Sequence, residues 1–475
     1  MKYPRYPTYK ESGAEWIGEI PEHWDVKRLK FVSKIQFSNV DKHSFDSEMP
    51  VLLANYTDVY KNQFITTEME FMEATASLNE IKKFHLEAGD ILVTKDSETP
   101  DDIAIPALVK NTLPNLLCGY HLPMLRPNSH SLDSNYLFYL YSDKKFRGKY
   151  ESEANGITRF GLSQESFSDT FICIPDISEQ RTISLFLEEQ TSKIDYLISK
   201  TQIMINLLKE KRQAIITNAV TKGLDPNVPM KDSGVEWIGE IPEHWNLSRI
   251  KFVSEVTMGQ SPSSDSYLYN GNLPFLQGCA EFGEIFPNPK HYCEVANKTS
   301  RPGDILLSVR APVGEINLSD RVYGIGRGLC SIRPLKDKGD YLKWYLFAAK
   351  NKLISISNGS TYDAVAIGDV KNLEIPISMV EFEQNAICEY LNIETTKIEL
   401  IISKHLKLID LLKEYKASAK LEKWFMNIAP LVLINSILHG VSRTTQPILQ
   451  FHCYYWQSVN EYSKINGFVV LFAEI

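Results

Sequence analysis

The sequence predicts an α/β (α+β) tandem repeat, in which two mixed domains are each followed by a long helix and the two helices pair. Three observations predict this fold. The decapeptide EWIGEIPEHW occurs at Glu15–Trp24 and again, unchanged, at Glu236–Trp245. Further matched blocks follow both copies in the same order. Each repeat then ends in a stretch with apolar residues seven positions apart, which is typical of paired helices.

The matched blocks define a shared frame. The longest pair, Glu11–Lys34 and Asp232–Glu255, is identical at 17 of 24 positions. The other pairs are AGDILV (Ala88–Val93) with PGDILL (Pro302–Leu307), Asn155–Gln180 with Asn358–Gln384, and TSKIDYLISK (Thr191–Lys200) with TTKIELIISK (Thr395–Lys404). The segments between these blocks are unlike each other. One scaffold that presents two different surfaces explains this pattern.

The order of blocks predicts the domain limits. We predict a first mixed domain at 1–176, a long helix at 177–222, a second mixed domain at 223–378, a second long helix at 379–418 and an atypical tail at 419–475. Short β-rich runs such as DILLSV (Asp304–Val309) and FICIP (Phe171–Pro175), bounded by turn residues, predict the strands of the mixed domains. Residues 178–221 contain no Pro or Gly, which permits one continuous helix.

The seven-residue period also predicts the helix–helix seam. The expected seam residues are Leu187, Ile194, Leu197, Met204, Leu208 and Ile215 in the first helix and Leu391, Ile398, Ile401, Leu408 and Leu412 in the second. The alternative is that each helix only covers the core of its own domain. The matching register of the two copies favours pairing.

Composition places the chain among globular proteins, with 43% hydrophobic and 23% charged residues. The net charge of −8 does not indicate a nucleic-acid partner, although a basic face can exist on an acidic chain. The seven cysteines form no CxxC pair, which indicates free thiols in a reducing cytoplasm. The N-terminus lacks the apolar core of a signal peptide, and the apolar stretch Trp424–Val441 contains polar residues, so we expect no membrane segment.

Catalytic motifs are missing from the sequence. YGIGRG (Tyr323–Gly328) is followed by a strand-like run rather than by a phosphate-binding helix, and GDILVTK (Gly89–Lys95) has Val93 where a nuclease needs a second carboxylate. Neither an Asn-Pro-Pro nor a GxxxxGK[ST] motif occurs. We therefore expect no catalytic residue, no metal site and no cofactor bound by this chain.

Several of these segments carry a family resemblance. They are the two decapeptide blocks, GDILLSVRAPVGEI (Gly303–Ile316), GRGLCSIRP (Gly326–Pro334) and the junctions that lead into and out of the first long helix. Through them, roughly residues 9–416 resemble the DNA-specificity (S) subunit of type I restriction–modification systems. The resemblance implies two target recognition domains, each of which reads half of a split site in double-stranded DNA. It also implies that the two long helices form an antiparallel coiled coil.

The same resemblance implies a non-catalytic subunit. Its partners would be modification (methyltransferase) subunits, expected to number two, and restriction (translocase/nuclease) subunits. Those partners would use S-adenosylmethionine, ATP and Mg. The alternatives are a self-sufficient restriction or methylation enzyme, against which the missing motifs count, and a coiled-coil adaptor that binds protein.

Candidate DNA contacts are polar residues on predicted loops. They are Lys95, Asp96, Ser97, Thr158 and Arg159 in the first domain, and Gln260, Ser261, Arg310, Arg327, Thr361 and Tyr362 in the second. Each could instead be an ordinary solvated loop residue. The repeated tryptophans Trp16, Trp24, Trp237 and Trp245 belong to the frame, and we expect them to pack in the domain or against a partner subunit.

The tail at 419–475 has no counterpart in the first repeat. Two hypotheses explain it: a frameshift near Ala417–Lys420 replaced the original helix end, or a real additional element packs on the coil.

Overall fold

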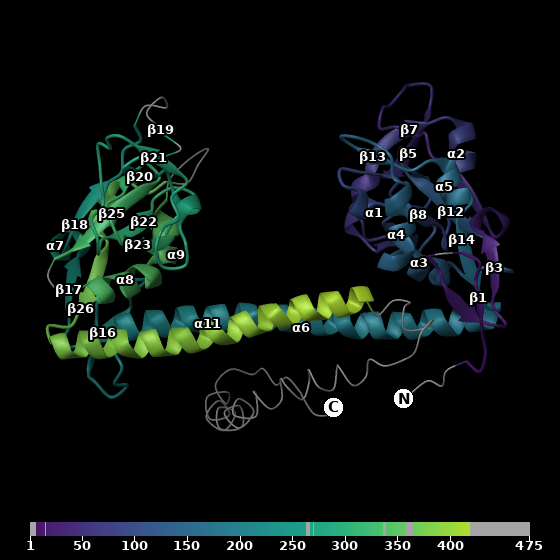
Figure 1. Cartoon of the computed structure of the whole chain (residues 1–475). Helices are drawn as coiled ribbons and strands as arrows, with labels where there is room; N and C mark the ends of the chain where they lie inside the picture. The colour runs from purple at the N-terminus through teal and green to yellow at the C-terminus, as the bar shows by residue number, and fades with distance from the viewer. Residues whose placement is uncertain are drawn as a thin grey trace. The chain divides into compact units, whose positions relative to one another are not determined.

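The computed structural model describes residues 6–14, 16–262, 267–268, 270–335, 339–357 and 364–418, which fall into two compact units (Figure 1). Unit 1 comprises residues up to Tyr196 together with those from Leu411 onward, and unit 2 comprises Leu197–Asp410. The tail at 419–475, with its two hypotheses, and the apolar stretch 424–441 lie outside the described residues. The division falls inside both long helices, so the predicted domain limits stay a prediction.

Unit 1 is a mixed α/β body that leads into the first long helix. Its strands are β1 (Tyr9–Glu11), β2 (Glu19–Pro21), β3 (Asp25–Arg28), β4 (Ser33–Phe37), β5 (Met49–Ala54), β6 (Phe64–Ile65), β7 (Met72–Ala76), β8 (Ile91–Val93), β9 (Asp96–Ser97), β10 (Pro106–Val109), β11 (Leu116–Cys118), β12 (Pro123–Pro127), β13 (Phe160–Gly161) and β14 (Phe171–Ile174). Its helices are η1 (Leu29–Phe31), α1 (Tyr56–Lys61), α2 (Leu78–Phe84), η2 (Pro100–Asp102), α3 (Ser134–Ser142), α4 (Lys144–Glu153), α5 (Gln164–Ser168) and the start of α6 (Ile177–Lys222).

A five-stranded sheet with the order β4-β12-β8-β10-β6 forms the centre of unit 1, and a three-stranded sheet, β11-β5-β7, lies beside it. Strands β8 and β10 are buried at every position, which explains why their sequences are continuously apolar rather than alternating. Helix α3 begins where the Asp133 side chain accepts a hydrogen bond from the Tyr136 N–H, and its six residues 136–141 are all buried. It therefore forms part of the core.

Unit 2 repeats this plan. Its strands are β15 (Met230–Asp232), β16 (Glu240–Pro242), β17 (Asn246–Arg249), β18 (Ser254–Met258), β19 (Tyr267–Leu268), β20 (Leu273–Leu276), β21 (His291–Cys293), β22 (Ile305–Ser308), β23 (Ile316–Leu318), β24 (Gly324–Ile325), β25 (Leu329–Pro334) and β26 (Glu374–Ile377). Its helices are α7 (Ile250–Val253), η4 (Cys279–Glu281), α8 (Gly339–Ala348), α9 (Lys350–Ile356), α10 (Ile367–Asn372) and most of α11 (Glu381–Ser418). The two main sheets have the orders β18-β25-β22-β23 and β19-β21-β20-β24.

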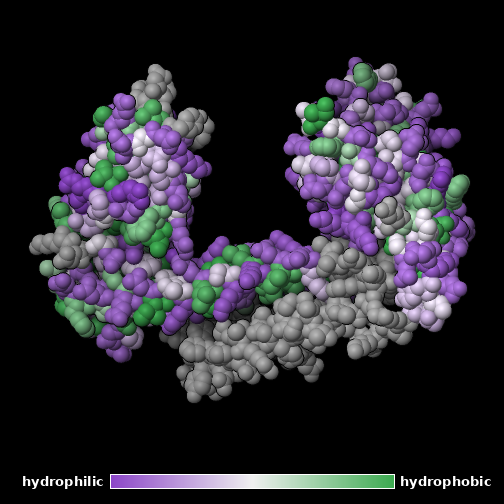
Figure 2. Space-filling model, viewed as in Figure 1, coloured by the Kyte–Doolittle hydropathy of each residue, from purple (hydrophilic) through white to green (hydrophobic). Residues whose placement is uncertain are grey.

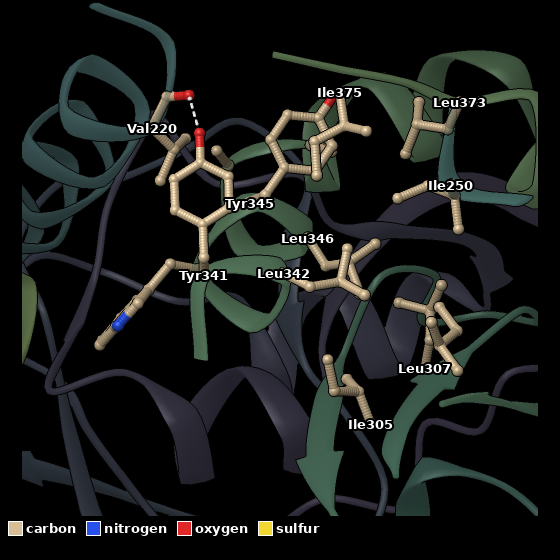
Figure 3. Packing of buried hydrophobic residues seen from close by; sticks show 14 of the residues in the cluster. Val220, Ile250, Ile305, Leu307, Tyr341, Leu342, Tyr345, Leu346, Leu373 and Ile375 are labelled. Atoms are coloured by element: carbon tan, nitrogen blue, oxygen red, sulfur yellow. Dashed lines mark hydrogen bonds between the residues drawn. The ribbon is translucent and has the colours of Figure 1, made fainter. Parts of the chain in front are cut away.

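The end of α6 belongs to the core of unit 2. Ile216, Ala219 and Val220 are buried in the same apolar cluster as α8 and the strands β22 and β26. The hydroxyl of Tyr341 on α8 donates a 3.0 Å hydrogen bond to the carbonyl of Val220 (Figure 3). The Gln213 side-chain amide likewise donates to the carbonyl of Phe347. Helix α6 begins in unit 1, and these contacts in the core of unit 2 stabilise its C-terminal end.

Within each unit an ion pair joins the segments of the two long helices, and the order of the paired residues is antiparallel (Figure 1). Inside unit 2, Arg212 of α6 forms a 2.9 Å ion pair with Glu399 of α11. Inside unit 1, Asp195 of α6 forms a 2.6 Å ion pair with Lys416 of α11. Asp195 and Glu399 occupy equivalent positions in the matched blocks, so the same interhelical ion pair occurs once in each unit.

Burial along the helices corrects two positions of the expected seam. Leu187, Ile194, Leu391 and Ile398 are buried, and Leu208, Ile215, Ile401, Leu408 and Leu412 are partly buried. Leu197 and Met204, by contrast, are 38% and 41% exposed, whereas Ile205 is 1% exposed. The core spacing after Ile194 and Thr201 is therefore four residues rather than three, and Ile198 and Ile205 take the inward positions.

The repeated decapeptide contacts the first turn of the long helix that begins within its own unit. In unit 2, Trp245 Nε1 donates a 3.1 Å hydrogen bond to Glu383, and His244 Nε2 lies 2.9 Å from the same carboxylate. In unit 1, His23 Nε2 lies 3.1 Å from Glu179, the equivalent glutamate of α6. A carboxylate in the first turn also interacts favourably with the helix dipole.

The four frame tryptophans pack within the bodies of their units. Trp24 and Trp245 are completely buried. Trp16 packs edge-on against Phe146 at 4.9 Å between ring centroids, and Trp237 packs against Tyr345 at 5.8 Å. In each unit the two tryptophans of the decapeptide therefore fix it to the body of that unit.

A second repeated contact explains the AGDILV and PGDILL blocks. Arg126 donates two 2.7 Å hydrogen bonds to Asp90, and Arg333 donates two 2.9 Å hydrogen bonds to Asp304. Both aspartates are almost completely buried, so the paired arginine is what makes their burial possible. These two pairs fix β8 against β12 and β22 against β25.

Candidate nucleic-acid interface

Unit 1 brings two distant groups of candidate residues together. Strand β9, which contains Asp96 and Ser97, pairs antiparallel with β13, directly after Thr158 and Arg159. The Leu162 N–H also donates to the carbonyl of Lys95. Ser97 is buried, Lys95 and Asp96 are partly exposed, and Thr158 and Arg159 are exposed. Of these five candidates, Thr158 and Arg159 are therefore best placed to meet a partner.

A short hairpin holds these two exposed residues. Asn155 and Gly161 exchange two backbone hydrogen bonds, of 3.1 and 2.9 Å, that close the loop between them. Gly156 has φ +155°, and a Cβ there would lie 1.9 Å from the Arg159 carbonyl oxygen, so only glycine fits. Ile157 at the tip is 97% exposed. The loop thus presents Ile157, Thr158 and Arg159 outward on a fixed backbone.

A hollow of about 590 Å³ opens beside this hairpin. Arg159 lines it together with Asn39, Asp41, Lys42, His43, Asn55, Tyr56, Thr57, Tyr120 and His121. His121 Nδ1 lies 2.7 Å from Asp96, and its backbone has the unusual φ of +67°. Burial, and then the charge of Asp102, raises the pKa of Tyr56, so its hydroxyl stays protonated and can donate a hydrogen bond. The amide, lysine and guanidinium groups that line this hollow suit contacts with base edges and phosphates.

Unit 2 places Gln260, Ser261 and Arg327 next to one another. The Ser261 hydroxyl donates to the Gln277 side-chain carbonyl and accepts from the Arg327 N–H, both at 3.2 Å. The Gln260 N–H donates to the carbonyl of Ile325. The candidate residues from two separate segments therefore form one cluster.

Arg310 lies at the edge of the same cluster. The Val309 N–H donates to the carbonyl of Gly328, and Arg310 forms an isolated antiparallel bridge with Ala364. Arg310 is the first exposed residue after the buried strand β22. Thr361 and Tyr362, the remaining candidates, lie outside the described residues.

Strand registers show which positions correspond in the two units. Pro127 pairs with Ser33 and Pro334 with Ser254, so equal counts along these strands are equivalent. Asn39 then corresponds to Gln260, and Tyr120 to Arg327. Asp96 corresponds to Arg310, because Asp96 pairs antiparallel with Gly161 and Arg310 pairs antiparallel with Ala364, which matches Gly161 in the repeated blocks. Two of the residues chosen in unit 2 from the sequence, Gln260 and Arg327, therefore correspond to residues that line the hollow of unit 1.

Sequence reasoning missed Tyr56, Tyr120 and His121. For Tyr120 a signal existed, because CGYHLPMLRP and IGRGLCSIRP share a glycine, a leucine and a final Arg-Pro at the same spacing. For Tyr56 and His121 no motif exists. Among the described residues no group of three or more His, Cys, Asp or Glu side chains could hold a metal ion, and no helix is long and apolar enough to span a membrane.

A family model for the type I restriction modification DNA specificity domain matches the chain twice, at residues 21–207 and 242–409. The chain belongs to this family. Its relatives include the type I restriction enzyme MjaX specificity subunit of Methanocaldococcus jannaschii, which is 31% identical over 90% of this chain and 97% of the relative. The EcoKI specificity subunit of Escherichia coli is 22% identical over half of each chain.

A solved structure agrees on the fold of this specificity subunit. That solved structure comes from a study of the complex assembly and conformational transition of the type I R-M system. It superposes with a TM-score of 0.66 at 24% identity, over 86% of this chain and 98% of that chain. The two copies of the family domain match the two sets of repeated contacts described above.

Proposed function

We propose that this specificity subunit reads a bipartite DNA site, with one half-site for each unit, and thereby directs methylation and restriction by its partners. One observation carries the proposal: the frame contacts are duplicated, whereas the equivalent loop positions carry different side chains. Asp90 and Asp304 are each bound by an arginine, but Asp96 corresponds to Arg310 and Tyr120 to Arg327. Two half-sites of different sequence require this combination.

The reading residues in this proposal are those around the hollow of unit 1 and the Ser261–Arg327 cluster of unit 2. They include the sequence candidates Thr158, Arg159, Gln260, Ser261, Arg310 and Arg327, with Tyr56, Tyr120 and His121 added. Lys95, Asp96 and Ser97 support these reading residues, and the Asp96 carboxylate orients His121. Thr361 and Tyr362 stay in the proposal by their equivalence to Thr158 and Arg159.

The long helices offer a place for the modification subunits. Figure 2 shows apolar side chains among polar ones along the visible face of these helices. Tyr196 and Leu207 of α6 are exposed, and so are their equivalents Leu400 and Leu411 of α11. Exposed apolar surface that recurs at equivalent positions suits two copies of one protein partner. We therefore place two modification subunits there, with the restriction subunits bound through them in the cytoplasm. S-adenosylmethionine, ATP and Mg would act in those partners.

Methylation mapping tests this function. The chain is expressed with its modification subunits in cells that lack other adenine methylation, and methylated sites are read by long-read sequencing. We expect a split motif. Replacing residues 197–410 by the corresponding part of a relative with a different motif should change one half and leave the other unchanged. A continuous motif, or an unchanged motif after this exchange, would contradict the proposal.

Binding measurements separate this function from a protein adaptor. The assembled methyltransferase should bind its own site with an affinity that falls steeply as salt increases, because phosphate neutralisation releases counterions. An adaptor would show no DNA-dependent signal, and methylation by the chain alone would support the self-sufficient enzyme instead.

A further inference from the structure

Four of the seven arginines of unit 2 form two contrasting pairs. Arg333 and Arg212 are bound by carboxylates, and unit 1 carries a basic residue that makes the same contact at each equivalent position, Arg126 and Lys416. Arg310 and Arg327 are different, because within the described part of the chain neither forms an ion pair, and their equivalents in unit 1 are Asp96 and Tyr120. Positions that keep their residue type hold the frame together. Among the positions that change their residue type, Arg310 and Arg327 adjoin the Ser261 cluster, whereas Arg301, which corresponds to Glu87, lies at the other end of β22.

The backbone under Arg327 is held in place. Gly326 and Gly328 are buried on either side of the exposed arginine. A Cβ on Gly326 would lie 2.9 Å from Gln277 Oε1, and one on Gly328 would lie 2.6 Å from the Gln277 carbonyl oxygen. The turn therefore presses against Gln277 and aims a single long side chain outward. A side chain on a backbone that is already held in place loses less conformational entropy when it binds a partner.

Arg310 is held in a comparable way. Val309, directly before it, is buried and makes backbone hydrogen bonds to Gly328 on one side and Val365 on the other, both at 2.9 Å. The same Val309–Gly328 bond joins the Arg310 segment to the Arg327 turn. Arg310 and Arg327, which form no ion pair with any described residue, are thus both exposed on backbone segments that hydrogen bonds join to each other.

We propose that Arg310 and Arg327 read guanine, so that the half-site recognised by unit 2 contains at least one G·C pair that unit 1 does not require at the corresponding position. A guanidinium donates two parallel hydrogen bonds to O6 and N7 of guanine, an edge that consists only of acceptors. The carboxylate of Asp96 and the phenol of Tyr120 cannot make this contact. The proposal rests on the proposed DNA-reading function and adds the identity of a base.

The test uses the assembled methyltransferase, after its motif has been mapped. Arg310→Gln and Arg327→Gln are compared with the wild type on duplexes in which each base pair of the motif is changed in turn. Glutamine matches adenine rather than guanine. At least one variant should lose roughly five- to a hundredfold of the preference for guanine at a single position of the unit 2 half-site. The other half-site should be unchanged.

Arg301→Gln is the matched control, since Arg301 is exposed and lies before β22, at the opposite end from Arg310. It should leave the base preference unchanged. The proposal is overturned if the unit 2 half-site contains only A·T pairs, or if both test variants weaken methylation of all duplexes equally, which indicates phosphate contacts. Either result is distinct from a failure of the bipartite function, because the exchange of residues 197–410 would still alter one half of the motif.

Discussion

Trp245 should stabilise unit 2 without influencing which DNA sequence is read. Its side chain is completely buried, and its indole N–H donates to Glu383 at the start of α11. Replacing a buried tryptophan by alanine costs about 3–5 kcal/mol. For a body of this size each kcal/mol lowers the melting temperature by about 2–4 °C. Trp245→Ala should therefore lower the melting temperature of the unit 2 transition by roughly 6–20 °C.

Trp245→Phe separates packing from the hydrogen bond. Phenylalanine keeps most of the apolar contact but cannot donate to Glu383, and a hydrogen bond to a charged group contributes about 1.5–3 kcal/mol. The expected loss is therefore smaller than for alanine. Phe252→Ala is the control, because Phe252 is 67% exposed and its loss should change stability by less than about 0.5 kcal/mol.

Scanning calorimetry of the purified chain measures the transitions, and methylation mapping of the assembled enzyme measures specificity. Trp24→Ala should lower a different transition, that of unit 1. A melting temperature within 3 °C of the wild type for Trp245→Ala, or an altered methylation motif, would refute the assignment of the decapeptide to the frame.

Three further predictions concern the same frame. Tyr341→Phe removes the hydroxyl that donates to the carbonyls of Val220 and Pro376, and it should destabilise unit 2 by about 1–3 kcal/mol in urea unfolding; no change would show that the end of α6 does not depend on this contact. Burial alone would raise the pKa of Glu383, but hydrogen bonds from Ser378, His244 and Trp245 together lower it below its ordinary value of 4.5. Its contribution to stability is therefore present above about pH 4.5 and lost as the pH falls further, and Glu383→Gln should flatten this acid-side slope in stability measured against pH. Exchanging the charges of Arg212 and Glu399 should cost about 0.2–1 kcal/mol for either single reversal and less for both together, as measured by a double-mutant cycle.

The sequence predicted the duplicated frame because identical residues make identical contacts. His23 and His244 both lie against a glutamate, and Asp90 and Asp304 both bind an arginine. When both partners of a contact are repeated, the same two residue types recur in each repeat, and this can be recognised from the sequence alone. The chemistry of these contacts, a buried carboxylate with its partner, was visible only once strand pairing had brought the two residues together.

The seam was predicted less well. Two adjacent apolar residues could each occupy the seam at two places, Leu197 or Ile198 and Met204 or Ile205. Both members of each pair fit a seven-residue period, so the period cannot decide between them. Packing in the folded chain decides, since Ile205 is buried and Met204 is 41% exposed. The candidate DNA-contacting residues were incompletely predicted for a similar reason. Tyr120 and Arg159 line the same hollow because a sheet and a hairpin bring them together, and no spacing along the chain indicates this.

The duplicated ion pair has a consequence for the origin of this architecture. The first repeat alone contains both Asp195 and Arg212, the two charges that pair here with Lys416 and Glu399. Two copies of that single repeat would align antiparallel and satisfy both charges across a true twofold axis. Such an ancestor would read a palindrome. Fusion of its two copies into one polypeptide would release each half from matching the other, and would open the way to asymmetric sites.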